Sequence, residues 1–263
     1  MTNYSQPKFV LKLLIGMALL CLFILPVGAK EPYHDNDWLF GAEIYLWGSA
    51  IGGKSSTGND IDFSFNDIIS NLNMALMGTI VAHKNKWSYL ADIIYMGVSD
   101  DEKGSFTLPV GSGVAVGTEL DVNIKSWIVQ PMVGYRVYDN QKGSIDLTAG
   151  ARYIWMETEL KLETTSSLGS RKIKNSESGD NWDGSVGVRG LLNLSEKWYA
   201  SGYLDVGTGQ SDYTWQAKAA VGYKFNKVDA VLGYRYLKWK FDNNDVFDNL
   251  KLDGPFAGVR FSF

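Results

Sequence analysis

Residues 144–156 read SIDLTAGARYIWM, and this stretch alternates between two kinds of side chain. The odd positions are all apolar: Ile145, Leu147, Ala149, Ala151, Tyr153 and Trp155. The even positions are polar or small, apart from Ile154 and Met156 at the end of the stretch. Successive side chains of a β-strand point to opposite faces. The stretch is therefore typical of a strand that separates an apolar medium from a polar one.

The same alternation recurs along the chain, in ten segments. They are 38–50, 73–83, 87–99, 120–138, 144–164, 180–194, 198–211, 213–226, 228–241 and 249–263. Short links (84–86, 139–143, 195–197, 226–227) alternate mostly with longer ones (51–72, 100–119, 165–179), while 242–248 is intermediate and 211–212 is tight. This layout predicts an all-β fold, a closed antiparallel transmembrane up-and-down β-barrel of about ten strands, within a range of eight to twelve.

Aromatic side chains gather at both ends of these segments. Near the short links lie Trp38, Trp87, Trp198, Tyr223, Phe225, Phe261 and Phe263. Near the longer links lie Tyr95, Trp127, Trp155, Trp182, Tyr213, Trp215 and Tyr236. We interpret them as two girdles at the headgroup levels of a membrane. A soluble barrel or sandwich is the alternative, but it turns its large apolar face inward and needs no girdles.

Residues 1–29 have the layout of a secretory signal peptide. Lys8 and Lys12 precede an apolar stretch, and small residues end it before Lys30. A membrane-anchoring helix is the alternative, although the apolar stretch is short for a span. We predict a signal peptide at 1–29 and a barrel domain at 30–263, exported through the periplasm to the outer membrane of a Gram-negative bacterium. Cleavage would remove Cys21, the one cysteine of the chain, and with it any disulfide.

The last residues of the chain carry a family resemblance. The segment GVRFSF, 258–263, resembles the C-terminal recognition strand of bacterial outer-membrane β-barrel proteins, in Gly258, Val259, Phe261 and Phe263. Phe256 departs from that pattern, which often has a polar residue there. The segments WLFGAEIYLWGSAIGG, DIISNL and KWSYLADIIYMGVS resemble a group of uncharacterised proteobacterial outer-membrane barrel proteins. The resemblance implies an assembly signal read by the barrel-assembly machinery, and it says little about activity.

The faces opposite the apolar ones would point into the barrel lumen. They carry charges of both signs, among them Glu43, Asp92, Arg152, Arg189, Asp205, Arg235 and Arg260. The lumen of a barrel of about ten strands is narrow. Such charges are expected to pair, because an unpaired buried charge has a high desolvation cost. Two interpretations stay open: a structural salt-bridge plug, and a narrow or gated polar channel of porin-like type. We also expect Arg260 to lie beside Glu43, where the last strand pairs with the first.

Other features of the sequence argue against several function classes. A pI of about 5.3 argues against a nucleic-acid partner. Outside the signal peptide, the histidines are His34 in the N-terminal arm and His83 beside a short link, away from the outer rim. No enzyme-like set of residues is therefore completed, and we expect no catalysis, no cofactor and no metal site. Ser64 to Asp67 has helix-capping spacing before residue 68, but a loop packed on the strand rim is the preferred interpretation.

The function that follows is an integral outer-membrane β-barrel protein of structural or narrow-pore type with a charged lumen. We expect a monomer surrounded by outer-membrane lipid and lipopolysaccharide. The acidic stretches 99–104 and 241–249 are interpreted as solvated loops, the alternative being a cation bridge to lipopolysaccharide phosphates. A surface-exposed interaction or adhesion protein, acting through 51–72, 100–119 and 165–179, is the alternative function. An outer-membrane enzyme is the third.

Overall fold

The computed structural model describes residues 37–55, 60–63, 72–106, 116–166, 169–241 and 247–263. The predicted signal peptide and the capping segment at 64–67 lie outside the described residues. Within the described residues, no helix has both the length and the apolar character needed to cross a membrane.

The described residues form twelve antiparallel strands. In chain order they are β1 (Leu39–Trp47), β2 (Ala50–Ser55), β3 (Asp60–Phe63), β4 (Leu72–Lys84), β5 (Trp87–Phe106), β6 (Val116–Asn140), β7 (Gly143–Ser166), β8 (Gly169–Asn193), β9 (Trp198–Gly209), β10 (Ser211–Lys224), β11 (Val228–Phe241) and β12 (Phe247–Ser262).

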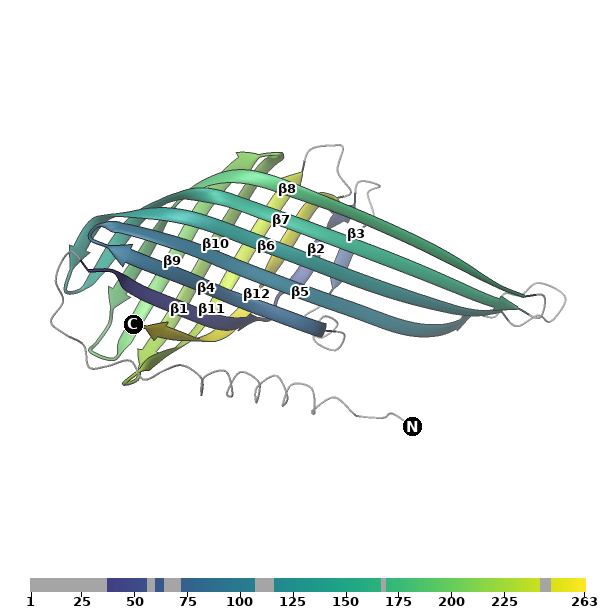
Figure 1. The fold of residues 1–263 in the computed structure, drawn as a ribbon, viewed down its shortest axis with the longest axis horizontal. Coiled ribbons are helices and arrows are strands. Elements are labelled where there is room, and N and C mark those ends of the chain that lie inside the picture. Colours follow the sequence, from purple (N-terminus) through teal and green to yellow (C-terminus); the bar gives the residue numbers. More distant parts are fainter. Residues whose placement is uncertain (1–36, 56–59, 64–71, 107–115, 167–168, 242–246) are drawn as a thin grey trace.

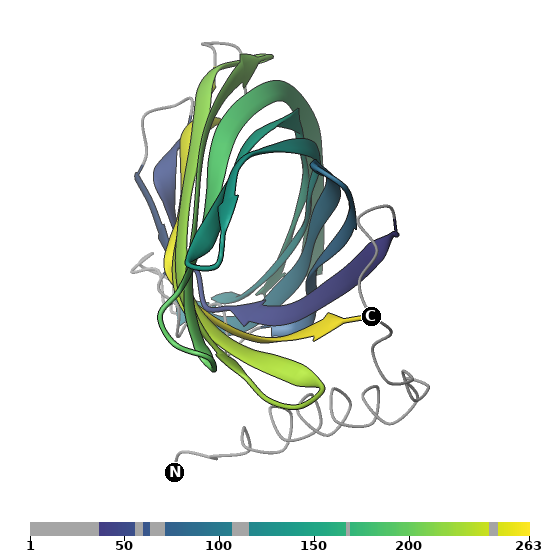
Figure 2. The ribbon, with the colours of Figure 1, turned by 90° about the vertical axis from the view of Figure 1, so that its left-hand side faces the viewer.

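Ten of these strands, β1 and β4 to β12, each pair with the next along the chain, and β12 pairs back with β1. The prediction of a closed antiparallel barrel of ten strands is confirmed. Figure 2 views this ring from one end. The barrel closes where the sequence predicted, since Glu43 of β1 is the register partner of Arg260 of β12. Closure leaves no free edge in the ring for another chain to pair with.

Two of the predicted long loops are largely strand. The links 100–119 and 165–179 contain the ends of β5 to β8, which stay paired from Ser99↔Asn123 to Phe106↔Val116 and from Glu157↔Ser178 to Ser166↔Gly169. The acidic stretch 99–104 is part of β5 rather than a loop. The ladder satisfies the backbone donors and acceptors there, which outweighs the weak strand propensity of the side chains. Figure 1 shows these four strands running far beyond the rest of the barrel.

The first predicted long loop, 51–72, contains a hairpin. After β1, the chain continues as β2, which pairs with the outer part of β12 and with β3. The pairing of β1 with β4 ends at Ile44↔Gly78, so the two strands part above this point. The backbone N–H of Trp47 then donates to the Sδ atom of Met77 of β4 at 3.2 Å, in place of a backbone carbonyl. Side chains therefore close the wall where the described backbone pairing stops.

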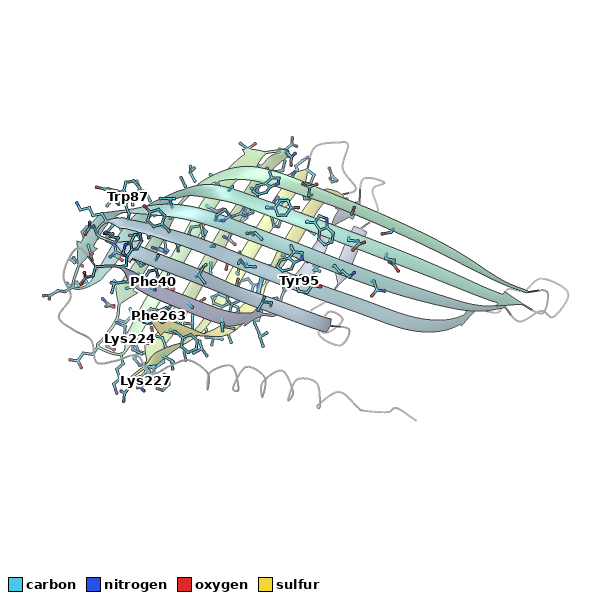
Figure 3. The ribbon with its side chains drawn as sticks, viewed as in Figure 1. Phe40, Trp87, Tyr95, Lys224, Lys227 and Phe263 are labelled. Carbon is cyan, nitrogen blue, oxygen red and sulfur yellow. The ribbon has the colours of Figure 1, made fainter. Side chains whose placement is uncertain are left out.

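The outer face of the barrel is a continuous band of exposed apolar side chains. At mid-height Leu232 is 65% exposed. At the end with the short turns, rings pair across strands, as Trp87 with Tyr135 and Trp198 with Tyr223. Further along the strands a second set pairs as Tyr95 with Trp127, Tyr153 with Trp182 and Trp215 with Tyr236. Figure 3 labels Trp87, Phe40 and Phe263 in the first girdle and Tyr95 in the second.

Beyond the second girdle, the outer face changes from apolar to charged. Lys125 and Glu157 form an ion pair at 3.7 Å, one step past Trp127 on their face. Lys251 and Asp253 do the same on β12 at 2.8 Å. Charged groups favour water over hydrocarbon. The second girdle therefore separates a part of the barrel suited to lipid from a part suited to water.

Candidate functional site: two layers across the lumen

The structure turns all seven selected charged residues into the barrel. Six of them form three pairs: Glu43 with Arg260, Asp92 with Arg235, and Arg152 with Asp205. Arg189 pairs with a residue outside the seven, Asp146. The first pair joins neighbouring strands, whereas the pairs Asp92–Arg235 and Arg152–Asp205 join strands that are not adjacent in the ring. Asp92–Arg235 therefore spans the lumen between β5 and β11, whereas Arg152–Asp205 reaches past one strand, β8.

Arg152 of β7 forms one half of the crossing layer. Its Nη2 donates to both carboxylate oxygens of Asp205 on β9, at 2.6 and 2.5 Å, and its Nη1 donates to Oγ1 of Thr214 at 2.6 Å. Arg152 is 0% and Asp205 1% exposed. Gln130 of β6 donates its amide to Asp205 at 2.7 Å. This carboxylate is thus held by both a guanidinium and an amide.

Arg235 of β11 forms the other half. Its Nη1 lies 2.7 Å from the Asp92 carboxylate of β5 and donates at 2.9 Å to the hydroxyl of Tyr45 on β1. Asp92 also accepts hydrogen bonds from Tyr45 at 2.8 Å and from Thr79 at 2.7 Å. A charge with several hydrogen bonds recovers much of the solvation that it loses on burial.

Gln216 of β10 joins the two halves. Its amide donates to Gln130 Oε1 at 3.2 Å, and its own Oε1 accepts from Arg235 Nε at 2.6 Å. The result is one connected network, which we call the ionic layer. Its members are Tyr45, Thr79, Asp92, Gln130, Arg152, Asp205, Thr214, Gln216 and Arg235. The layer draws side chains from β1, β4, β5, β6, β7, β9, β10 and β11, so it reaches across the whole lumen.

Sequence reasoning missed the uncharged members of this layer. Gln130 and Gln216 sit at inward positions of segments that were already predicted as strands, and both are almost completely buried. A buried amide needs both donor and acceptor partners. Each glutamine has the same parity as the charged inward residues of its segment, which could have identified it as a lumen residue. The sequence does not say which residues across the lumen the two side chains meet.

Two smaller clusters lie nearer the short turns. Glu43 accepts from Lys218 Nζ at 3.1 Å and from Arg260 Nη2 at 2.6 Å. Asp146 likewise pairs with two cations: it accepts from Arg136 Nε at 2.9 Å and from Arg189. In both clusters one carboxylate is shared between two basic side chains.

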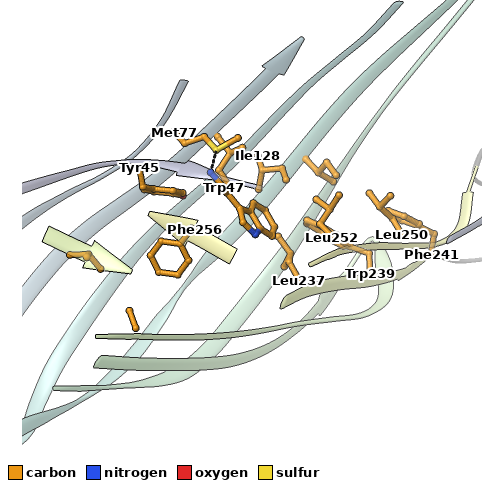
Figure 4. Packing of buried hydrophobic residues seen from close by; sticks show 14 residues of the cluster. Tyr45, Trp47, Met77, Ile128, Leu237, Trp239, Phe241, Leu250, Leu252 and Phe256 are labelled. Carbon is orange, nitrogen blue, oxygen red and sulfur yellow. Dashed lines mark hydrogen bonds between the residues drawn. The ribbon is translucent and has the colours of Figure 1, made fainter. Parts of the chain in front are cut away.

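A second layer, which is apolar, lies directly above the ionic layer, on the side away from the short turns. Four of its residues lie two positions beyond a member of the ionic layer on the same strand, about 7 Å further along. They are Ile94 beyond Asp92, Ile128 beyond Gln130, Ile154 beyond Arg152 and Leu237 beyond Arg235. All four are buried in one cluster, together with Tyr45, Trp47, Met77, Trp239, Phe241, Leu250, Leu252 and Phe256. Figure 4 shows these side chains packed against one another between the strands.

The apolar layer corrects the expectation of a lumen that is polar throughout. On β11, Arg235 shares its inward face with Leu237, Trp239 and Phe241, while Lys238 and Lys240 point outward. On β12, Leu250 and Leu252 point inward. This part of the barrel is apolar inside and charged outside, as in a soluble barrel. The reversal was visible in RYLKWKF, 235–241, where the apolar residues have the same parity as the arginine.

The layers also contact each other through aromatic rings. The guanidinium of Arg235 lies 4.9 Å from the ring centroid of Trp47, and that of Arg152 lies 5.8 Å from that of Trp239. Cation–π contacts of this kind favour a desolvated cation. The arginines therefore bind carboxylates within one layer while resting on the aromatic rings of the next.

The structure places the predicted assembly signal on the closing strand. Phe263 is exposed and Val259 is half-buried, whereas Phe261 is only 9% exposed, against the expectation that it faces lipid openly. Gly258 lies opposite Tyr45, and a Cβ there would meet the Tyr45 Cβ at 2.7 Å. This glycine therefore has a packing role, because it leaves room for a tyrosine of the ionic layer.

The remaining expectations concern histidine and metal sites. His83 lies on β4 beside the short turn, as predicted, whereas His34 lies outside the described residues. Among the described residues, no group of three His, Cys, Asp or Glu side chains is placed to hold a metal ion.

Comparisons with known proteins concern the architecture. No protein-family model and no curated protein matches the sequence. Among solved structures, the translocator domain of the autotransporter NalP from Neisseria meningitidis is similar, with 13% identity, a TM-score of 0.43 and 99% of each chain covered. Ail, the attachment invasion locus protein of Yersinia pestis, has 11% identity and a TM-score of 0.34, over 87% of this chain and 99% of that chain.

A third similar structure is the toluene transporter TodX of Pseudomonas putida. It has 10% identity and a TM-score of 0.31, and the match covers 88% of this chain and 90% of that chain. The matched structures are bacterial outer-membrane β-barrel proteins, which is the architecture predicted from the sequence. At these identities the likeness concerns the fold and leaves the function of this chain open.

Proposed function

We propose that this chain is an integral outer-membrane protein of structural type, whose barrel is closed across its lumen rather than open as a steady pore. The observation that carries the proposal is the stacking of two layers across the lumen. The ionic layer lies within the apolar belt, and the apolar layer begins there and continues beyond the second girdle. The ionic layer crosses the lumen with side chains that are buried except for the half-buried Thr79, and the apolar layer lies directly on it. Hydrated ions have no polar path through a packed apolar layer.

The membrane location is supported by the outer face. An exposed apolar band lies between two aromatic girdles, and charged pairs begin past the second girdle. Exposed apolar surface of this extent is unfavourable in water and is expected in lipid. The proposal includes outer-membrane lipid around this band, and recognition of Gly258, Val259, Phe261 and Phe263 by the barrel-assembly machinery. It assigns no catalysis to the chain.

Replacing a belt leucine by arginine tests the membrane location. Leu232 lies midway along β11 between the girdles and is 65% exposed. In lipid, Leu232→Arg is expected to lower the free energy of unfolding by about 2–4 kcal/mol. The measurement is urea unfolding of the barrel folded into phosphatidylcholine vesicles.

Leu194→Arg is the matched control for this experiment. Leu194 is also exposed, but it lies just past the end of β8 and bonds to the backbone of the girdle residue Trp198. Arginine near the interface is expected to cost about 0–1 kcal/mol. Equal effects of the two substitutions would contradict a belt in lipid and favour a soluble barrel.

The extended strands favour a second candidate function, a surface interaction. Strands β6, β7 and β8 have 25, 24 and 25 residues, whereas about 9–11 residues span a membrane. With β5 they form a sheet that projects well past the second girdle (Figure 1). Such a platform supports an adhesion or docking role on the cell surface.

Shortening the extended sheet tests this second candidate. Asp100 pairs with Val122, and Glu159 pairs with Ser176, so the segments between these partners can each be replaced by a tight turn. The interaction role predicts that the shortened barrel still folds and that cells displaying it lose adhesion to an epithelial monolayer. Unchanged adhesion would exclude a role of the projecting sheet in adhesion to such cells.

A further inference from the structure

A cavity of about 430 Å³ lies between the ionic layer and the end of the barrel with the short turns. We call it the vestibule. Its inner boundary includes Asp92, Gln130, Gln216 and Arg235, and its outer part is lined by Phe40 and other residues near the chain end. Sites for small molecules in proteins have volumes of about 300–1,000 Å³. The vestibule is therefore large enough for a small ligand.

The charges that line the vestibule do not balance. Its described lining contains five cations, Arg136, Arg189, Lys218, Arg235 and Arg260, and three carboxylates, Glu43, Asp92 and Asp146. Glu43 and Asp146 are each shared by two cations. Arg136 also pairs with Asp139 at 3.1 Å, so the excess of positive charge falls on Lys218 and Arg260, which share Glu43. Such an excess is unfavourable in a narrow, partly desolvated space. The lining therefore favours an additional negative charge.

A buried donor on the lining supports the same conclusion. Arg235 is 1% exposed and uses its Nε and Nη1 atoms on Gln216, Tyr45 and Asp92. Its Nη2 atom has no hydrogen-bond acceptor among the described residues. Buried donors in proteins are almost always paired. The Arg235 guanidinium at the inner boundary of the vestibule thus keeps an unused donor and its positive charge.

The wall of the vestibule is not polar throughout. Leu39, Leu90 and Met132 line it together with the charged groups. An inorganic anion alone would leave these side chains against water, whereas an organic anion would cover them. Binding pockets commonly combine an apolar lining with a few polar groups that fix the orientation of the ligand.

The surroundings of the mouth favour the approach of an anion. The four short turns each contain or adjoin a lysine: Lys86, Lys142, Lys197 and Lys227. Figure 3 shows Lys227 at this end of the barrel, close to Lys224. The same links also contain Asp139 and Glu196, so with Lys84 they hold five basic and two acidic residues. A net positive end raises the local concentration of anions and the rate at which they arrive.

We propose that the vestibule binds a small soluble organic anion, with its phosphate or carboxylate head between the basic side chains and its apolar part against Leu39, Leu90 and Met132. This goes beyond the proposed function, since a barrel that is closed to ions can still bind a ligand at one end. A closed lumen is tested by conductance, and this site is tested by binding, so failure of one leaves the other standing.

The test is calorimetric titration of the full barrel in an uncharged detergent with hexyl phosphate, inorganic phosphate and hexylamine. Hexyl phosphate is expected to bind, inorganic phosphate to bind more weakly, and hexylamine not to bind. The variant Lys218→Gln/Arg189→Gln brings the lining to three charges of each sign, while Glu43 keeps Arg260 and Asp146 keeps Arg136. It is expected to weaken hexyl phosphate binding by at least about tenfold, since each lost charge lies in a site of lowered dielectric.

The control variant Lys240→Gln/Lys251→Gln removes the same charge from the outer face, where both side chains are well exposed. Its affinity for hexyl phosphate is expected to equal that of the unchanged protein. If the double lumen variant fails to fold, Lys218→Gln alone is expected to give part of the loss. Three results would overturn the proposal: no binding of hexyl phosphate, equal binding of hexylamine, or binding of phosphatidylglycerol vesicles without binding of hexyl phosphate.

Discussion

Arg152 and Asp205 form an ion pair whose two side chains are completely buried. A buried pair is held by its geometry, and removing one partner leaves the other charge without compensation. Arg152→Met is therefore expected to lower the free energy of unfolding by about 3–5 kcal/mol. Urea unfolding in phosphatidylcholine vesicles measures the change.

Two further variants make this prediction specific. Arg152→Met combined with Asp205→Leu removes both charges and should recover most of the lost stability, because no unpaired charge remains. Lys240→Ala breaks an exposed contact with Asp212 at 3.9 Å and should cost no more than about 1 kcal/mol. A double variant as unstable as the single one would show that the pair is not the source of the effect.

At this scale the sequence predicted which faces are charged but only some of the partners. The pair Glu43–Arg260 follows from barrel closure, because first and last strands must meet in register. The pair Arg152–Asp205 does not follow from any local pattern, since β7 and β9 are separated by β8. Which residues meet across a lumen depends on the barrel's diameter and stagger. Local alternation contains neither quantity.

Two backbones approach closely at the junction of β1, β2 and β12. Gly254 of β12 lies inward against residues 48–49, which link β1 to β2, and its carbonyl accepts from Trp47 Nε1 at 3.1 Å. A Cβ at this position would clash with the backbone carbonyl of Gly48. The junction therefore requires a glycine for the close approach of two backbones.

Replacing this glycine should loosen the junction. Gly254→Ala is expected to destabilise the barrel by about 1–3 kcal/mol, the usual cost of overpacking against a backbone that has little room to move. Gly190→Ala is the control, because its Cβ would meet only the Ser144 carbonyl at an ordinary 3.9 Å. Thermal unfolding in detergent compares the two, and equal midpoints would contradict a junction set by Gly254.

The strands themselves were predictable, and their lengths were not. Each of the ten predicted segments corresponds to one strand of the ring, because alternation between lipid and lumen leaves a period of two. The strand ends of β5 to β8 were predicted as loops, since the residues in 99–104 are polar and charged. Once these strands rise beyond the second girdle, no lipid imposes the alternation. Pairing with a neighbour is then the main support for the strand, and the sequence of one segment does not show it.

For the whole molecule, the two layers set what the barrel can pass. The sequence predicted an apolar outer face and a charged inner face, but not the apolar layer. The reason is that each strand, including RYLKWKF, was assumed to have lipid along the whole of one face and a polar lumen along the whole of the other. In the structure, the character of the inward-facing side chains of β11 changes near Tyr236. On the short-turn side of Tyr236 the inward face of β11 carries Arg235 together with Gly233 and the buried Val231, and beyond Tyr236 it carries the apolar Leu237, Trp239 and Phe241. Closure of the lumen rests on both layers together.

Single-channel conductance tests closure most directly. A difference in gel mobility between unboiled and boiled samples first shows that the barrel is folded. The full barrel is then reconstituted into planar bilayers. The account predicts no regular conductance steps, because the apolar layer of Trp47, Leu237 and Trp239 excludes hydrated ions. Steady steps of uniform size in the unchanged protein would contradict a closed lumen and favour a narrow pore through the ionic layer.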